Sequence, residues 1–400
     1  FDVPYIHIGT DEVAFTHPTF VSEMVAYLRA KGKKVISWNP GWPYKAGEID
    51  MTQLWSYRGK KQKGIPAIDC RFHYLNHYDA FADLVALYQS RILNVPQGDE
   101  EHAGAILALW NDRYIADEKA NLLQNNFYPA LLALAERAWQ GGGTEYFDGN
   151  GTILPTDPES PTFKTFADFE RRLCWHKAHH FANEPFAYVP QTAIEWNITD
   201  AFPNDGQLSK IFPPEKAIKE KYLYNGKTYS CRKAIGASIY LRHTWGNLVP
   251  AFYPNPQPNH TAYAYTYVYS PRTQAVGLWV NFQNYSRSEK DLPPRQGKWD
   301  YKESQIWLNG TPLAPPLWES QHSQLSNEIP LTNENFEVRP PLQVSLKKGW
   351  NLLLLKLPVG AFSTPEVRLV KWHFTCAVVT PDGREVPKGI KYSVSRKKQK

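Results

Sequence analysis

Residues 1–13 read FDVPYIHIGTDEV, and this stretch decides how the first half of the chain folds. The run PYIHIGT at residues 4–10 is rich in apolar and β-branched residues and predicts a strand, which ends near Gly9. Asp11 and Glu12 follow directly. Successive side chains of an extended segment point in opposite directions, so two adjacent carboxylates at a strand end can do two different jobs in one pocket.

Strand-like and helix-like runs alternate from this stretch to about residue 183. The five expected strands are 4–10, 34–38, 51–57, 67–75 and 104–110, and the expected helices are 20–32, 78–89, 127–139 and 163–181, with Gly32 as the stop signal of the first helix. Strand followed by helix predicts parallel strands joined by helical crossovers. The strands tend to end in polar or aromatic residues, which is where an α/β barrel keeps its chemistry. We therefore expect residues 1–183 to form part of a (β/α)8 TIM barrel.

Residues 184–400 show a different pattern. AYAYTYVYS at 262–270 and VGLWVNFQN at 276–284 alternate with a period of two, which is typical of strands. Asn309–Gly310 and Asp382–Gly383 are turn signals, and a hairpin is expected around Lys348–Gly349. These features predict an all-β sandwich of jelly-roll or galactose-binding-like type. The expected fold class is thus α/β plus all-β, with domains at 1–183 and 184–400.

The composition favours a large globular protein with flat binding surfaces. Of 400 residues, 14 are Trp and 23 are Tyr, an excess that suits stacking on sugar rings, although any single Trp is more often part of a core. The net charge of +6 owes much to the tail at 388–400, which we interpret as a solvated terminus rather than a nucleic-acid site. No apolar run approaches the roughly 18 residues of a membrane span, and no signal peptide begins the chain.

Six short motifs occur in the order in which one enzyme family has them. They are IHIGTDEV (6–13), VISW (35–38), QLWSY (53–57), HYLN (73–76), ALWND (108–112) and FYPALLALAERAW (127–139). The first resembles the His-x-Gly-Gly-Asp-Glu signature of the family 20 glycoside hydrolases, the β-N-acetylhexosaminidases, and the others resemble the elements that follow it in that family. The resemblance implies that the five expected strands match strands four to eight of the family's barrel.

The resemblance also implies roles for three residues in a retaining hydrolysis assisted by the substrate. In this family the 2-acetamido oxygen of the sugar attacks the anomeric carbon, so no enzymic nucleophile is needed. Glu12 would protonate the leaving oxygen and later act as base for water. Asp11 would accept a hydrogen bond from the acetamido N–H, and Tyr74 would donate one to the acetamido oxygen.

The remaining site residues follow from the same resemblance. Those expected to bind the sugar are Trp38, Trp55 and Trp110 as walls of the pocket, Asn76 and Asp112 on outer hydroxyls, and His7 beside the acids. Read without the resemblance, each Trp is more often core than platform. His7 is first interpreted as a structural core histidine and second as a residue that orients the site. The scattered cysteines Cys70, Cys174, Cys231 and Cys376 predict neither a zinc site nor a disulfide framework, and no metal or cofactor is expected.

Three positions depart from the family pattern. Thr10 stands where the family usually has a second glycine, Asn76 where it has aspartate, and Asp112 where it has glutamate. These departures leave Asp11, Glu12 and Tyr74 intact, so they bear on the choice of sugar rather than on the reaction. The preference between GlcNAc and GalNAc, the linkage cut and the natural glycan stay open. An alternative is a sugar-binding or structural protein derived from such a hydrolase; the motif of family 18 chitinases is absent.

The sequence also predicts what the barrel lacks. A barrel of this kind needs about 250 residues, and strands one to three have no counterpart in residues 1–183. We therefore expect an N-terminal half or a second chain to complete it, or this chain alone to be a poor catalyst. The expected partners are N-acetylhexosamine-containing oligosaccharides or glycoconjugates, with no nucleic acid. The expected location is the periplasm, the outer membrane or the outside of a bacterial cell.

Overall fold

The computed structural model describes residues 3–75, 78–110, 118–282, 297–315, 341–365 and 370–395. The chain divides into two compact units. Unit 1 consists of Phe1–Leu75, Leu87–Trp110 and Leu131–Phe147, and unit 2 consists of Asn76–Ala86, Asn111–Ala130 and Asp148–Lys400. Both helices and sheets are present, and the sheets are mostly antiparallel. The prediction of a mixed helix and sheet protein is confirmed at this level.

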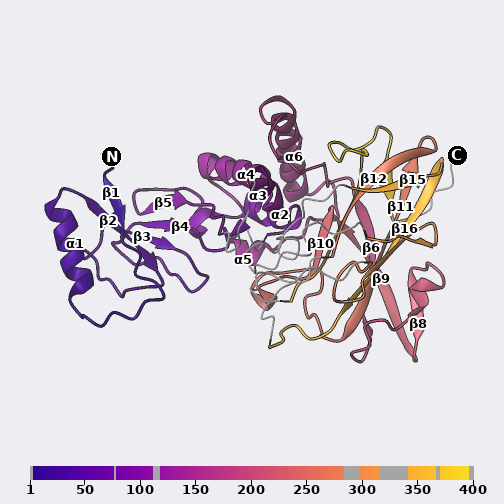
Figure 1. Cartoon of the computed structure of the whole chain (residues 1–400), viewed down its shortest axis with the longest axis horizontal. Helices are drawn as coiled ribbons and strands as arrows, with labels where there is room; N and C mark the ends of the chain where they lie inside the picture. The colour runs from indigo at the N-terminus through magenta and orange to yellow at the C-terminus, as the bar shows by residue number, and fades with distance from the viewer. Residues whose placement is uncertain are drawn as a thin grey trace. The chain divides into compact units, whose positions relative to one another are not determined.

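Unit 1 is built on a sheet of five strands that follow one another in chain order (Figure 1). The strands are β1 (Tyr5–His7), β2 (Lys34–Asn39), β3 (Met51–Leu54), β4 (Ala67–Asp69) and β5 (His102–Ala105). Every neighbouring pair is parallel. The carboxyl ends of all five strands therefore lie at one edge of the sheet. Each strand falls within or overlaps a stretch that the sequence predicts as extended.

Helix α1 (Phe20–Ala30) covers part of this sheet. Val21 and Val25, one turn apart, are buried in a cluster with Val35 of β2, and this packing rather than intrinsic propensity holds the helix in place. The helix ends as predicted, because Gly32 takes the left-handed conformation (φ +74°). The amides of Gly32 and Lys33 then bond the carbonyls of Arg29 and Leu28.

Two of the connections between strands contain no helix. Residues 40–50 join β2 to β3 and residues 55–66 join β3 to β4, and the sequence pattern likewise places no helix in either segment. Proline and glycine recur in both segments, at Pro40, Gly41, Gly47, Gly59 and Gly64, and they disfavour a helix. Tyr44, Ile49 and Ile65 from these loops fill the cluster around Val35 instead. The α2 helix (Ala82–Gln89) and the 3₁₀ turn η2 (Ile92–Asn94) do lie between β4 and β5.

The remaining helices and the strands of unit 2 complete the chain. The helices are α3 (Glu118–Gln124), α4 (Phe127–Gln140), α5 (Phe147–Asn150) and α6 (Pro161–His179), with the 3₁₀ turns η3 (Pro213–Glu215) and η4 (Gly246–Leu248). The strands are β6 (Glu195–Thr199), β7 (Phe202–Pro203), β8 (Lys221–Tyr224), β9 (Lys227–Ile235), β10 (Ser238–Arg242), β11 (His260–Ser270), β12 (Gln274–Asn281), β13 (Gln305–Leu308), β14 (Thr311–Pro312), β15 (Leu342–Leu346), β16 (Gly349–Val359), β17 (Trp372–Val379) and β18 (Lys391–Ser393).

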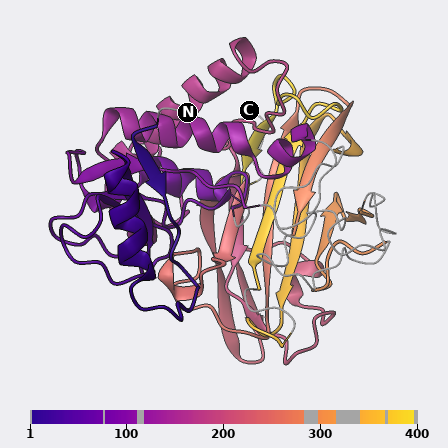
Figure 2. The ribbon, with the colours of Figure 1, turned by 60° about the vertical axis from the view of Figure 1, so that its left-hand side comes forward.

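Among the described residues, the strands of unit 2 form two antiparallel sheets, one of four strands and one of nine (Figure 2). The smaller runs β10-β17-β12-β15, and the larger is centred on β11 and β16, which pair along their whole length. The predicted turn at Asn309–Gly310 is confirmed, because it joins the paired strands β13 and β14. The hairpin predicted around Lys348–Gly349 is wrong: β15 pairs with β12, whereas β16 pairs with β11 and β13. The turn there carries the chain from one sheet to the other.

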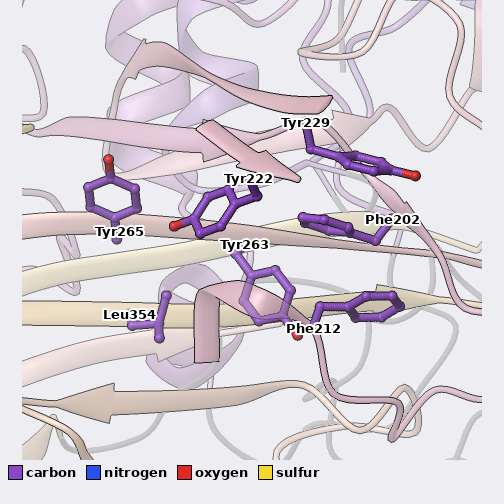
Figure 3. Close-up of a cluster of buried hydrophobic side chains, with 7 residues drawn as sticks. All are labelled: Phe202, Phe212, Tyr222, Tyr229, Tyr263, Tyr265 and Leu354. Atoms are coloured by element: carbon purple, nitrogen blue, oxygen red, sulfur yellow. The ribbon is translucent and has the colours of Figure 1, made fainter. Parts of the chain in front are cut away.

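Around strand β11 the larger sheet is buried on both faces. Its tyrosines and its small residues alternate, so Tyr263 and Tyr265 lie on one face while Ala262 and Ala264 lie on the other. The tyrosine face packs in a buried aromatic cluster (Figure 3), whose members are Phe202, Phe212, Tyr222, Tyr229, Tyr263, Tyr265 and Leu354. On the other face Trp196 of β6 meets Phe374 of β17 edge to face, with ring centroids 5.1 Å apart. The two sheets of unit 2 are therefore in contact.

The tryptophans of unit 2 separate into core and partly exposed residues. Trp279 and Trp372 are buried, and Nε1 of Trp372 donates to the carbonyl of Leu357 at 3.0 Å. Trp307 and Trp350 are half-buried on the tyrosine side of the larger sheet. The expectation that any one Trp belongs to a core thus holds for the first pair.

A buried carboxylate ties the start of α2 to the smaller sheet within unit 2. Asp79 accepts the backbone N–H groups of Phe81 and Ala82 at 2.8 and 2.6 Å, and its Oδ2 lies 2.9 Å from Nε2 of His373. Burial opposes the ionisation of Asp79, but the electrostatic interaction with His373 and these hydrogen bonds outweigh it and hold the pKa of Asp79 below its ordinary value. Asp79 is therefore a structural residue.

We predict that Trp196→Ala destabilises the protein by about 3–5 kcal/mol, because it removes a fully buried ring and leaves a cavity between the two sheets of unit 2. Urea unfolding followed by circular dichroism measures the change. Trp175→Ala on α6 of the same unit is the matched control: its ring is 49% exposed, and its loss should cost below about 1 kcal/mol. Equal losses for both variants would contradict the packing described for the two sheets.

Candidate functional site

The described site residues lie at or just beyond the carboxyl ends of the five strands of unit 1. The acids follow β1, Trp38 lies near the end of β2, Trp55 follows β3, Tyr74 follows β4 and Trp110 follows β5. Tyr74 forms an isolated parallel bridge with Ala108, which extends the sheet beyond β4 and β5. Parallel pairing in chain order thus brings five separate motifs to one edge of one sheet.

The acid loop, residues 9–12, leaves β1 through a tight left-handed turn. Gly9, Thr10 and Glu12 all have positive φ, of +75°, +86° and +51°. The carbonyl of Gly9 accepts the backbone N–H of Trp38 at 2.9 Å, so the β1–β2 ladder reaches the start of the loop. Beyond it, Asp11 is half-buried and Glu12 is exposed. The two carboxylates therefore differ in environment although they are adjacent in sequence.

Aromatic rings line the edge beside this loop. The ring of His7 lies 4.6 Å from that of Trp38, and the ring of Trp110 lies 6.4 Å from Trp38 on centroid distances. Trp38 is half-buried and Trp110 is 44% exposed, so neither is a core residue. Flat faces that remain open to solvent can stack on the apolar face of a sugar ring.

His7 is not the buried core histidine that the sequence first indicates. Its side chain is exposed at the end of β1, and its Nδ1 accepts the backbone N–H of Gly9 at 3.1 Å. Desolvation of the ring lowers the pKa of His7, while the negative charge of Asp11 acts in the opposite direction. His7 is therefore a neighbour of both Asp11 and Trp38.

Trp55 and Tyr74, which follow β3 and β4, are joined by a hydrogen bond. The hydroxyl of Tyr74 donates to the backbone carbonyl of Trp55 at 2.5 Å, and Nε1 of Trp55 donates to the carbonyl of Pro40 at 2.6 Å. Beneath them, burial raises the pKa of the Cys70 thiol to about 11, against opposing hydrogen bonds with Gln53 and Tyr74. In this conformation the hydroxyl of Tyr74 donates its proton to the protein backbone. The hydroxyl must rotate away from the Trp55 carbonyl before it can donate to a ligand.

A buried carboxylate that sequence reasoning missed supports the loop carrying Tyr74. Asp69, at the end of β4, binds the Arg71 guanidinium through both oxygens at 3.0 and 3.1 Å and accepts the hydroxyl of Tyr146 at 2.9 Å. It also accepts the backbone N–H of Leu93 at 2.8 Å. Burial disfavours the charge of Asp69, but the Arg71 hydrogen bonds outweigh it and lower the pKa of Asp69. An apolar strand that ends in Asp with Arg two residues later was the available signal.

Two predicted site residues, Asn76 and Asp112, lie outside the described residues. Within the described ranges, no three His, Cys, Asp or Glu side chains are arranged as metal ligands would be. No described helix combines the length and the apolar character that crossing a membrane requires.

The geometry limits what this edge of the sheet can do. It offers one exposed carboxyl group, one half-buried carboxyl group, a phenol and open aromatic faces. Such a set can donate and accept protons and bind a flat, polar ligand through stacking and hydrogen bonds. No protein-family model matches the chain, and none of the curated proteins matches it.

We predict that Asp69→Asn destabilises the protein by about 3–5 kcal/mol at pH 7, because Arg71 then loses its buried counter-charge. Since the pKa of Asp69 is lowered in the folded state, its contribution is complete above the unfolded pKa of about 4 and is lost as the pH falls through the folded value. Urea unfolding at pH 7, 5 and 3 should therefore show the difference from wild type shrinking in acid.

Asp148→Asn is the control, because Asp148 is exposed. It should leave the stability within about 0.5 kcal/mol of wild type across the series. A difference between wild type and Asp69→Asn that stays constant from pH 7 to pH 3 would show that Asp69 is not an ionised partner of Arg71.

Proposed function

We propose that this chain carries the second half of a family 20-like glycosidase barrel, strands four to eight, followed by a β-sandwich accessory domain of jelly-roll or galactose-binding type. The proposed reaction is hydrolysis of terminal non-reducing N-acetyl-β-D-hexosamine residues from glycans. The proposed mechanism is substrate-assisted and retaining, and it passes through an oxazoline. The proposal includes a periplasmic, outer-membrane or extracellular location in a bacterium.

One observation carries the proposal. The motifs that resemble the family follow one another along the chain, and the five parallel strands follow one another in the same order across the sheet. The strand motifs, five of the six, therefore bring their described end residues to the carboxyl edge, which is where barrel enzymes hold their active sites. A chance match of short motifs gives no reason for this common edge.

In the first step the carbonyl oxygen of the 2-acetamido group attacks the anomeric carbon, and the bond to the leaving oxygen breaks. Glu12 gives its proton to that oxygen, and its exposure on the acid loop lets it reach an outgoing group. Asp11 accepts the acetamido N–H and stabilises the positive charge that develops on the ring. The products are the released alcohol and an oxazolinium ion held against the aromatic wall of Trp38 and Trp110.

In the second step water attacks the anomeric carbon from the side that the leaving group vacated. Glu12, now ionised, takes a proton from that water, and the bond to the acetamido oxygen breaks. Two inversions at the same carbon give net retention. Tyr74 assists both steps by donating to the acetamido oxygen, which requires its hydroxyl to leave the carbonyl of Trp55.

The sheet of unit 1 has two open edges in the part of the chain that the structure describes. β1 pairs only with β2, and β5 pairs only with β4. Open parallel edges expose unpaired backbone groups and invite another strand. We propose that an N-terminal half of the protein, or a second chain, pairs with these edges and completes the barrel.

We predict that Glu12→Gln lowers kcat by roughly 10²- to 10⁴-fold on N-acetyl-β-hexosaminides with poor leaving groups, because Gln cannot donate the proton. Aryl glycosides with good leaving groups need less protonation and should lose less in the first step. The assay uses aryl and alkyl glycosides of GlcNAc and GalNAc, on this chain and on a form extended upstream by about 150 residues so that a whole barrel of about 250 residues is present.

Glu100→Gln is the matched control, since Glu100 is an exposed glutamate elsewhere in unit 1. It should leave kcat unchanged. Equal losses for good and poor leaving groups would argue against Glu12 as general acid. Binding of the sugars without hydrolysis by either form would instead favour the alternative of a non-catalytic sugar-binding protein.

A further inference from the structure

Thr10 occupies a backbone conformation that suits glycine. Its φ is +86°, and a β-branched residue with positive φ is a rare and strained case. It is also the position at which the sequence departs from the glycine of the family signature. The side chain is nevertheless buried, so something in the fold holds Thr10 in this conformation.

A directed chain of hydrogen bonds does so. The hydroxyl of Ser37 donates to the carbonyl of Gly9 at 2.9 Å, and this uses its only proton. The hydroxyl of Thr10, 2.5 Å from that of Ser37, must therefore be the donor of the pair. The order is Thr10 to Ser37 to the Gly9 carbonyl, and it closes a ring around the Gly9–Thr10 peptide. Ser37 is fully buried in β2, so water cannot replace either partner.

The hydroxyl chain lies on the side of the sheet away from the aromatic wall. Side chains alternate along β2, and Val35 packs with the cluster that includes Val21 and Val25 of α1. Ser37 shares the face of Val35, and Trp38 points to the other face. The bulk that Thr10 adds relative to glycine therefore does not fill the sugar pocket.

The loop after β2 closes over the same turn. Gly41 packs so tightly there that a Cβ at its position would lie 2.6 Å from the carbonyl oxygen of Trp38 and 2.9 Å from that of Thr10. The backbone N–H of Trp42 approaches the Thr10 hydroxyl oxygen to 3.5 Å. Thr10 is thus held by β2 and by the segment that follows β2.

We propose that Thr10 is a positioning residue: its hydroxyl chain through Ser37 fixes the left-handed turn that directs Asp11 and Glu12. A glycine would adopt the same turn without strain but would leave it free to move. The acid loop of this protein thus has less backbone freedom than a glycine would allow, because two neutral hydroxyls hold it in place. We call the hydroxyl pair of Thr10 and Ser37 the lock. The inference deepens the proposed function, because it assigns the orientation of its general acid to a residue that touches no substrate.

The test compares Thr10→Ser, Thr10→Val, Thr10→Gly and Ser37→Ala. The variants are made in whichever form hydrolyses the glycosides, this chain or the upstream-extended protein. Thr10→Ser keeps the donor and should retain kcat within about threefold. Thr10→Val, Thr10→Gly and Ser37→Ala should lower kcat on poor leaving groups by about 10- to 100-fold, the cost of a displaced catalytic group, with smaller losses on good leaving groups. Thr10→Gly should do so without a fall in Tm, because glycine relieves the strain. The double variant Thr10→Val with Ser37→Ala should be no worse than either single variant.

A second readout does not depend on activity. The amide of Trp38 donates to the Gly9 carbonyl that the hydroxyl chain holds, so its hydrogen exchange reports on the lock. Thr10→Val and Ser37→Ala should speed this exchange by roughly 5- to 10-fold, the worth of one hydrogen bond. Thr52→Val is the matched control, because the buried hydroxyl of Thr52 in β3 has no hydrogen-bond partner within the described residues. It should change neither exchange nor kcat.

The two readouts separate the failure of this inference from the failure of the proposed function. Absence of hydrolysis by the upstream-extended wild type refutes the proposed reaction, and the exchange rates then decide the role of Thr10 alone. Unchanged Trp38 exchange in Thr10→Val and Ser37→Ala overturns the inference, whatever the activity. So does an active wild type whose kcat is unaffected by these substitutions, or a Thr10→Gly loss that runs parallel to a fall in Tm.

Discussion

The parallel pairing of β1 to β5 in chain order is the constraint on which the candidate site depends. It places segments as distant as residues 9–12 and Trp110 at one edge of one sheet. The hydrogen bond from the Trp38 amide to the Gly9 carbonyl carries this register into the acid loop. A shift of β2 by one residue would turn Trp38 toward α1 and Ser37 toward the pocket. The aromatic wall and the lock on Thr10 thus follow from a single register.

Two pairs of polar side chains support the loops at this edge, and one pair is neutral while the other is charged. The acid loop rests on the neutral hydroxyls of Thr10 and Ser37, and the loop of Tyr74 rests on the charged pair of Asp69 and Arg71. Because the pKa of Asp69 is lowered by its partners, protonation weakens the second support in acid. The first support has no titrating group. The two supports therefore respond differently to pH.

The sequence predicts the parts of this structure that depend on local pattern. The β-branched runs locate the five strands, and Gly32 locates the end of α1 because only a residue tolerant of positive φ can close that helix. Local pattern does not determine pairing partners, so the turn at Lys348–Gly349 is readable as a hairpin although its strands belong to different sheets.

The same limit applies within the site. The proline and glycine residues at 40–50 and 55–66 indicate from the sequence that these segments are loops. They do not indicate the hydrophobic cluster that the loops fill, because that cluster depends on Val35 and on the packing of α1. Tyr146 reaches Asp69 from 77 residues away, and no spacing rule links the two. The strain at Thr10 is a property of its backbone, which a departure from a motif can indicate but not measure.

The proposed site is tested most directly by calorimetric titration of a thiazoline analogue of the oxazoline intermediate into the upstream-extended protein. We expect saturable binding at one site and a loss of about 10- to 100-fold in affinity in Asp11→Asn, because an amide accepts hydrogen bonds less strongly than a carboxyl group that carries charge. Equal affinity for the wild type and Asp11→Asn, or no binding to either, would contradict the claim that the carboxyl edge of β1 to β5 is an N-acetylhexosamine site.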